Sequence, residues 1–129
     1  MPPVSAPEIP SRINAMLSAL IIVDHGSKLK EANEMLLEVV ALLRRQRPDL
    51  IVEAAHMELA EPGIAAAFEA CVRQGAAEVV FHPYMLSPGR HATRDIPRMA
   101  REAAAKHPGV AIRVTEPLGI HDKLGEVVL

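Results

Sequence analysis

Aromatic residues and cysteine are scarce in this chain of 129 residues, and each scarcity excludes a class of site. Aromatic side chains make up 2% and tryptophan is absent, so a cofactor pocket lined by stacked rings is excluded. The single cysteine, Cys71, excludes an internal disulfide and a zinc site built from cysteines. Low cysteine usage favours a reducing compartment over secretion, so we expect a cytoplasmic protein, with the plastid stroma as the open alternative.

The chain also lacks a strong charge of one sign and a long apolar run. Its formal net charge of −2 argues against binding nucleic acid through phosphates. No apolar run approaches the roughly 18 residues that span a bilayer, so we expect no membrane segment. Hydrophobic residues make up 50% and charged residues 23%, which is the composition of a folded domain, and the length indicates a single one.

The first fifteen residues differ from the rest of the chain. Proline removes backbone donors and blocks helices. It recurs in this stretch at Pro2, Pro3, Pro7 and Pro10. The basic start and long apolar core of a signal peptide are missing. We therefore expect a disordered lead-in over residues 1–15 and a single domain over residues 16–129.

Apolar runs alternate with amphipathic stretches from there onward. A short continuous apolar run predicts a strand buried on both faces, and apolar spacing of i, i+3, i+4 and i+7 predicts a helix. The expected strands cover residues 17–23, 50–57, 78–84 and 110–115. The expected helices cover residues 33–45, 62–74, 92–106 and 120–129.

This alternation predicts an α/β fold built from right-handed βαβ units. The expected architecture is a doubly wound, four-stranded parallel sheet with strand order 2-1-3-4. Ligands bind such a sheet beyond the carboxyl ends of its strands, where the strand order reverses, which here lies between the first and third strands. The last helix is short, and we interpret the surface it leaves as one that a partner chain covers.

Polar residues from three strands are expected at this switch point. His25 follows the first strand, Glu58 stands at the end of the second, and His91 closes the loop after the third. Core packing does not require two histidines and a carboxylate there, so we interpret all three as site residues. His56 shares its strand face with Glu58 and is expected to point deeper.

The remaining histidines and the cysteine are interpreted structurally. His82 lies inside a strand and is expected to be packed or hydrogen-bonded. His107 lies near a helix end, which favours a cation. Cys71 stands among apolar neighbours in a helix and is interpreted as a core residue. His121 opens the last helix, and the alternative that it faces the crevice is left open.

The expected site favours a metal ion and an anionic ligand. Neutral imidazoles and a carboxylate bind divalent first-row metals, and a helix start favours the neutral form of His91. Such a ligand set is incomplete and holds a metal loosely, which suits a site that hands the metal on. Positive charge stands around the crevice at Lys28, Lys30, Arg90 and Arg94.

Three motifs at these strand ends resemble one known family. They are VDHGS at 23–27, AHMELAEP at 55–62 and LSPGRHATRDIP at 86–97. Together, and in this order, they are similar to the small single-domain sirohydrochlorin chelatases. Their residues most resemble those of the sirohydrochlorin ferrochelatases. The resemblance implies ATP-independent insertion of a divalent metal into sirohydrochlorin, in siroheme or cobalamin-type biosynthesis. It favours Fe²⁺ and leaves Co²⁺ and Ni²⁺ open.

The resemblance also implies roles for individual residues. His25 matches the family histidine that accepts a proton and contacts the metal, and His91 matches its metal-binding partner. Glu58 matches a catalytic position near the macrocycle. The loop that lines the tetrapyrrole pocket falls on Leu86, Ser87, Pro88, Gly89 and Arg90. Arg90 and Arg94 are expected to bind the substrate's carboxylates. The metal is then a substrate, no tightly bound cofactor is expected, and a chain half the length of two-lobed chelatases implies a homodimer.

Two other functions remain open. A non-enzymatic metal carrier or sensor would bind a divalent metal at His25 and His91 without turning over a tetrapyrrole. A phosphoryl-transfer enzyme that works through a histidine also carries His-Gly after its first strand. Such phosphatases have arginine directly before that histidine, and Asp24 in its place disfavours this alternative.

Overall fold

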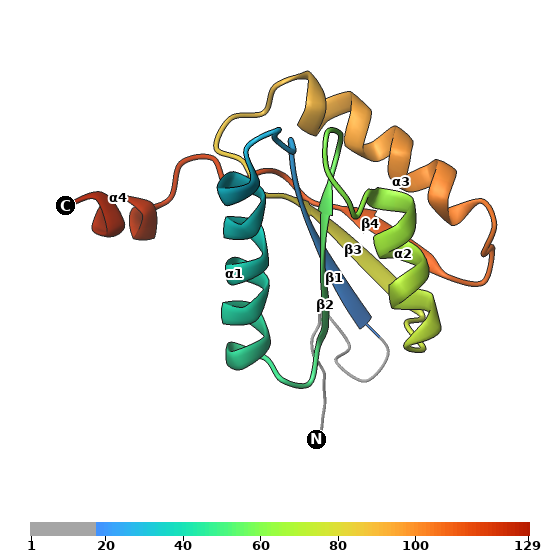
Figure 1. Cartoon of the computed structure of the whole chain (residues 1–129). Coiled ribbons are helices and arrows are strands. Elements are labelled where there is room, and N and C mark those ends of the chain that lie inside the picture. Colours follow the sequence, from blue (N-terminus) through green and yellow to red (C-terminus); the bar gives the residue numbers. More distant parts are fainter. Residues whose placement is uncertain (1–17) are drawn as a thin grey trace.

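Four parallel strands form one sheet in the computed structural model, which describes residues 18–129 (Figure 1). The strands are β1 (Ser18–Asp24), β2 (Ile51–His56), β3 (Glu78–Pro83) and β4 (Ala111–Val114). Their order is β2-β1-β3-β4, which confirms the predicted doubly wound topology. The expected lead-in over residues 1–15 and the start of the domain at residue 16 lie outside the described residues.

Helices pack on both faces of this sheet. The helices that do so are α1 (Lys30–Gln46), α2 (Ile64–Arg73) and α3 (Ile96–Ala104), and a π-helical turn, η1 (His91–Asp95), leads into α3. A further helix, α4 (Asp122–Val128), follows near the end of the chain. The helices α2 and α3 cover one face, and α1 lies over β1 and β2 on the other (Figure 1). Ile21 of β1 packs in the core under α2 and α3, and Ile22 packs in the core under α1. The strand β1 is therefore buried on both faces, as its continuous apolar run predicts.

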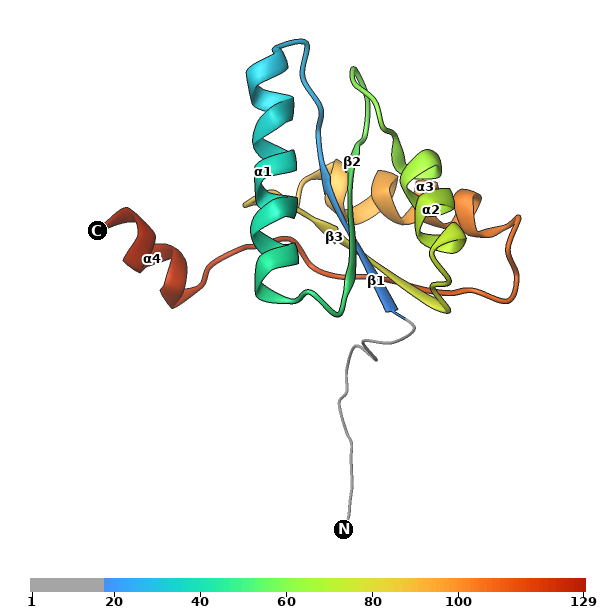
Figure 2. The same ribbon diagram turned by 60° about the horizontal axis from the view of Figure 1, so that its bottom comes forward.

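The α1 side of the sheet is covered less completely than the other side. No helix among residues 18–129 lies over β3 and β4 on this face (Figure 1). A hollow of about 540 Å³ remains there, lined mainly by aliphatic side chains. The helix α4 stands beyond α1, away from the sheet, in both views (Figure 1, Figure 2). None of the helices described is long and apolar enough to cross a membrane.

Helix starts differ from the sequence predictions. The helix α1 begins at Lys30 rather than at 33, because its first turn faces solvent and carries no apolar signal. The helix expected over 92–106 is divided into η1 and α3, and the Ile96 N–H bonds the His91 carbonyl across the wide turn. Pro97 explains the division, because it has no N–H to donate to a carbonyl one turn earlier. The shorter α2 and α4 begin two residues later than predicted.

Candidate active site

His25 and His91 lie side by side at the carboxyl edge of the sheet. The parallel register of β2, β1 and β3 makes the loops after all three strands leave from one edge. There the imidazole of His25 meets that of His91 edge to face, with ring centroids 4.5 Å apart and ring planes at 89°. Both residues were predicted from the sequence, and the structure brings them together.

Backbone hydrogen bonds fix the position of His25. Beyond the sheet, the Met57 N–H donates to the Asp24 carbonyl at 2.9 Å, and the Glu58 N–H donates to the His25 carbonyl at 3.2 Å. Gly26 follows with φ +87°, and a Cβ at this position would lie 1.8 Å from the Glu58 carbonyl oxygen. Glycine alone fits there, so the loop after β1 is locked to the loop after β2.

The first turn of α1 holds the other end of this loop. The Ser27 N–H donates to Asn33 Oδ1 at 2.9 Å, and Asn33 Nδ2 donates to the Ser27 carbonyl at 2.7 Å. Ser27 Oγ accepts the Leu29 N–H at 2.9 Å. The sequence analysis missed Asn33. Its signal is a serine just after a strand, followed six residues later by an asparagine in the first helical turn.

The buried His56 pairs with the partly exposed Asp24 behind these loops. His56 Nδ1 lies 2.6 Å from Asp24 Oδ1, and the His56 side chain is 2% exposed. The prediction that His56 points into the molecule is therefore confirmed. The Asp24 carboxylate bonds His56 through Oδ1, and no hydrogen bond joins it to the ring of the neighbouring His25.

The loop before His91 is exposed. Every residue of 86–90 faces solvent, including the apolar Leu86 at 64%. The start of this loop is held by the chain that follows β4. The Leu118 N–H donates to the Met85 carbonyl and the Gly119 N–H to the Leu86 carbonyl, both at 2.9 Å. The residues predicted to line the tetrapyrrole pocket therefore stand free of the core.

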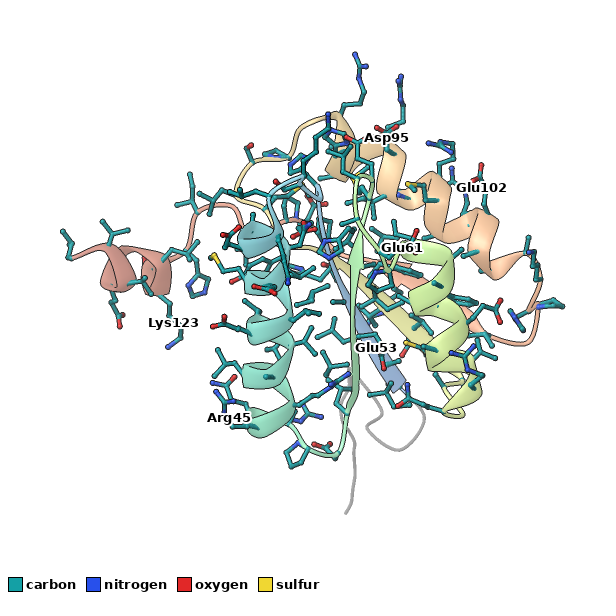
Figure 3. All side chains as sticks on the ribbon, in the orientation of Figure 1. Arg45, Glu53, Glu61, Asp95, Glu102 and Lys123 are labelled. Atoms are coloured by element: carbon teal, nitrogen blue, oxygen red, sulfur yellow. The ribbon has the colours of Figure 1, made fainter. Side chains whose placement is uncertain are left out.

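A carboxylate faces His91 from one helical turn away. His91 Nδ1 is buried without a hydrogen-bond partner, and Asp95 Oδ2 lies 3.6 Å from it. Arg94 Nε and Arg98 Nη2 lie 3.9 and 4.0 Å from the other oxygen of Asp95. Figure 3 labels Asp95 at the point where η1 passes into α3, above the ends of the strands. No role was predicted for Asp95 from the sequence, although its spacing of four residues from His91 indicates that the two side chains share a helix face.

Glu58 and the basic residues do not join the histidine pair in a ligand cluster. The strand β2 ends at His56, so Glu58 lies beyond the strand it was expected to end, and its side chain is exposed. No three His, Cys, Asp or Glu side chains of residues 18–129 gather to hold a metal. The basic residues predicted around the crevice are all exposed: Lys28, Lys30, Arg90 and Arg94. A metal held by the pair would therefore need further ligands from outside this group of side chains.

The remaining histidines and Cys71 have the structural surroundings that were predicted. Burial lowers the pKa of the His82 imidazole, whose Nδ1 bonds a threonine hydroxyl at 2.8 Å. His107 Nε2 pairs with Glu69 Oε2 at 2.8 Å. Burial raises the pKa of the Cys71 thiol to about 12, which keeps it unreactive. His121 is exposed and caps α4, where its Nδ1 accepts a backbone N–H at 3.0 Å.

Comparisons of sequence with known proteins point to one family. A sequence model of the CbiX family matches residues 19–129. The chloroplastic sirohydrochlorin ferrochelatase of Arabidopsis thaliana is 50% identical over 109 residues, which cover 84% of this chain and 48% of that protein. The sirohydrochlorin cobaltochelatase of Sulfolobus acidocaldarius is 33% identical over 109 residues, which cover 84% of this chain and 85% of that protein.

A solved structure has the same fold. The sirohydrochlorin chelatase SirB from Bacillus subtilis subspecies spizizenii, in complex with cobalt, matches with a TM-score of 0.82 and 33% identity. The match covers 88% of this chain and 48% of that one, so the chain spans about half the length of SirB and of the Arabidopsis protein. The three sequence motifs, the strand order and the matches to known proteins all indicate the same family. The chain belongs to the CbiX family of sirohydrochlorin chelatases.

Proposed function

We propose that the protein inserts a divalent metal ion into sirohydrochlorin without using ATP. The observation that carries this proposal is the His25–His91 pair, with ring centroids 4.5 Å apart at the carboxyl edge of the sheet. The names of the Arabidopsis and Sulfolobus relatives support sirohydrochlorin as the substrate. The SirB structure with cobalt supports metal binding by this fold.

Insertion exchanges two pyrrole protons for one metal ion, so the site must both hold the ion and accept protons. A ring nitrogen binds zinc at about 2.0–2.1 Å, and first-row metals share this preference for imidazole. Two rings at this separation can therefore share one ion after a rotation of either side chain. His25 is the more exposed ring, and we assign it the roles of proton acceptor and metal contact, with His91 as the metal ligand.

The macrocycle would lie over the histidine pair and against the exposed residues 86–90. Glu58 lies beside His25, to whose carbonyl its N–H donates, and its exposed carboxylate would face the same crevice. Arg90 and Arg94 would supply positive charge for the substrate's carboxylates. In this arrangement the metal is a substrate that enters and leaves with the product.

Iron is the metal that we propose for this chain. The Arabidopsis ferrochelatase is 50% identical, against 33% for the Sulfolobus cobaltochelatase. Imidazole nitrogens accept Fe²⁺, Co²⁺ and Ni²⁺ alike, so the assay described below compares all three metals.

We also propose that the working enzyme is a homodimer. The sheet face beside α1, which no helix of residues 18–129 covers, supports this, because its hollow of about 540 Å³ is lined by Leu20, Ile22, Leu42, Val80 and Leu118 among others. A second copy presents the same aliphatic face, as a two-fold interface requires. Sedimentation at micromolar concentration is expected to give a species of twice 14.0 kDa, and a species of 14.0 kDa alone would contradict it.

The proposed location is a reducing compartment, either the cytoplasm or a plastid. The single cysteine of the chain supports it, and the Arabidopsis relative is named as chloroplastic. Cell fractionation with antibody detection tests this, and recovery of the protein in a secreted fraction would contradict it.

The experiment that tests the proposed activity follows the absorbance of sirohydrochlorin with Fe²⁺, Co²⁺ and Ni²⁺ in turn, without oxygen. His25→Ala and His91→Ala are each expected to slow insertion by more than about a hundredfold, since general base catalysis contributes about 10²–10⁴-fold. Far-UV circular dichroism checks that both variants fold. His121→Ala removes another exposed histidine and is expected to keep the wild-type rate.

Two results would overturn the proposal. Spectral change no faster than the uncatalysed reaction for every metal would remove the chelatase activity. Metal binding at His25 and His91 without any turnover would instead identify the chain as a carrier or sensor.

A further inference from the structure

His91 carries a buried ring nitrogen that nothing in its surroundings yet bonds. The Nδ1 atom is shielded from solvent and has no hydrogen-bond partner among residues 18–129. The nearest carboxylate oxygen, Asp95 Oδ2, lies 3.6 Å away, just beyond hydrogen-bond distance. A buried ring N–H without a partner is costly, so this side of the ring calls for an acceptor.

The π-helical turn η1 brings this acceptor into place. His91 and Asp95 are its first and last residues, and the Ile96 N–H closes the turn on the His91 carbonyl. At the other end, the Thr93 N–H and hydroxyl both donate to the Gly89 carbonyl. The turn therefore presents the ring and the carboxylate on one side of the helix, with both held on the same short segment.

The Asp95 carboxylate has the freedom to serve this ring. Its contacts to Arg94 and Arg98 are long, at 3.9 and 4.0 Å, and both use Oδ1, whereas Oδ2 is the oxygen that approaches His91. The Asp95 side chain is 21% exposed, so water competes weakly for the remaining oxygen. A small rotation closes the gap to His91 Nδ1.

We infer that Asp95 is a positioning residue, whose carboxylate accepts the Nδ1–H of His91 and so turns the lone pair of Nε2 toward the metal. This inference rests on the proposed role of His91 as metal ligand. Metal-bound histidines commonly donate their other N–H to a carboxylate, which fixes the tautomer and the ring orientation. No proton leaves the His91–Asp95 pair in this role.

The two histidines of the site then differ in a way that matches two roles. The ring of His25 makes no hydrogen bond within the described part of the chain, and the adjacent carboxylate of Asp24 bonds His56. His25 can therefore present either nitrogen, as a proton acceptor must. His91 is restrained to one nitrogen, as a metal ligand should be.

The test compares Asp95→Ala and Asp95→Asn with the wild type in the full chain. The first readout is the tautomer of His91, from long-range ¹H–¹⁵N NMR at about pH 8, where an ordinary imidazole is neutral. The His91 signal is assigned by its loss in His91→Ala. The second readout is the affinity for Co²⁺ alone, by calorimetry.

We expect the wild type to carry its proton on Nδ1, and Asp95→Ala to shift the ring toward the Nε2–H form. Loss of such a carboxylate is expected to weaken Co²⁺ binding by about 10–100-fold. Asp95→Asn keeps an acceptor oxygen and should fall between the two, and it serves if the alanine variant does not fold. Glu102→Gln is the matched control, because Glu102 also pairs with Arg98, at 3.2 Å, but does not touch His91.

An unchanged tautomer and an unchanged Co²⁺ affinity in both Asp95 variants would overturn the inference. Failure of the proposed function looks different. If His91→Ala itself binds Co²⁺ as tightly as the wild type, then the ligand assignment is wrong, while the tautomer of His91 still reports whether Asp95 orients the ring.

Discussion

The two halves of the site are held in different ways. The His25 half is fixed by backbone, because β1 and β2 continue their pairing past the sheet and Gly26 lies against the Glu58 carbonyl. The His91 half is held by a short helical turn and an exposed loop over residues 86–90. The His25 half therefore continues the backbone pairing of the sheet, and we call it the fixed half. The His91 half is joined to the sheet through a loop and a helical turn, and we call it the open half.

This difference suits the two tasks of the proposed reaction. A fixed half keeps the proton acceptor at a constant place relative to the sheet. An open half leaves the loop over residues 86–90 accessible to a large, flat substrate. Functional residues commonly stand on loops that a rigid scaffold positions, and here one loop belongs to the scaffold itself. Substitutions should accordingly affect stability in the first half and binding in the second.

Gly26→Ala should have the largest effect and would break the fixed half. The positive φ disfavours any side chain, and the new Cβ would lie 1.8 Å from the Glu58 carbonyl oxygen, so the two loops must separate. We expect the free energy of unfolding to fall by more than about 3 kcal/mol and metal insertion to be lost. Urea unfolding measures the first effect and the absorbance assay the second.

Gly89→Ala is the matched change in the open half. A Cβ at this position meets no atom within 4 Å, and Gly89 does not adopt a positive φ. The free energy of unfolding should stay within about 0.5 kcal/mol of the wild type. Equal destabilisation by the two glycine substitutions would show that the halves are held alike.

His56→Leu should have the next largest effect, on the bond of the buried His56 behind the fixed half. It leaves the Asp24 carboxylate, now 2.6 Å from His56 Nδ1, without its partner, at a cost of about 2–3 kcal/mol of unfolding free energy. His107→Leu is the control, because its bond to Glu69 has a similar length but joins side chains that are 29% and 40% exposed, against 2% and 23% for His56 and Asp24. The His107 bond should therefore be worth about 0–1 kcal/mol. Urea midpoints compare the two, and equal losses would contradict a special role for the His56 bond.

The fold was predictable because its signals are local and repeated. The continuous apolar run of β1 indicates burial on both faces, and alternation with amphipathic helices then leaves few topologies. Helix starts were less predictable, because the first turn of α1 is polar and exposed. The division of the third helix depends on where Pro97 falls relative to the wide turn, which apolar periodicity does not encode.

Asn33→Ala should have a smaller effect on the same half. It removes both side-chain hydrogen bonds that hold Ser27, with an expected loss of about 1–2 kcal/mol in unfolding free energy. Asn33→Asp keeps the acceptor for the Ser27 N–H and loses the donor, so its loss should be about half as large. Thermal or urea unfolding ranks the two variants by stability. An aspartate variant as unstable as the alanine variant would contradict the interpretation that both hydrogen bonds of Asn33 stabilise the loop.

The site was predictable only in part, for a physical reason. His25 and His91 follow strands, and the topology alone carries strand ends to one edge. The contacts that support them join residues from separate elements: Asp24 bonds His56 across two strands, and Gly26 meets a carbonyl of another loop. Such contacts depend on the final packing distance between loops, which no local pattern in the sequence contains.

Arg90→Ala and Arg94→Ala should have the smallest effects, confined to substrate binding in the open half. Both side chains are exposed, and exposed ion pairs contribute about 0–1 kcal/mol each and are screened by salt. Loss of contacts that are equally strong in the ground and transition states raises KM and leaves kcat unchanged. We therefore expect a several-fold higher KM at low ionic strength, an unchanged kcat, and no difference at high ionic strength.

The two arginines should also differ from each other. Arg94 Nε lies 3.9 Å from the Asp95 carboxylate, which balances part of its charge, whereas Arg90 makes no ion pair within residues 18–129. Arg90→Ala should therefore raise KM more than Arg94→Ala. Arg101→Ala, an exposed arginine in the last turn of α3, is the control for a general loss of positive charge. An unchanged KM in both variants at low ionic strength would assign the substrate's carboxylates to the lysines after β1 or to backbone amides, and the fixed half would then bind the substrate as well.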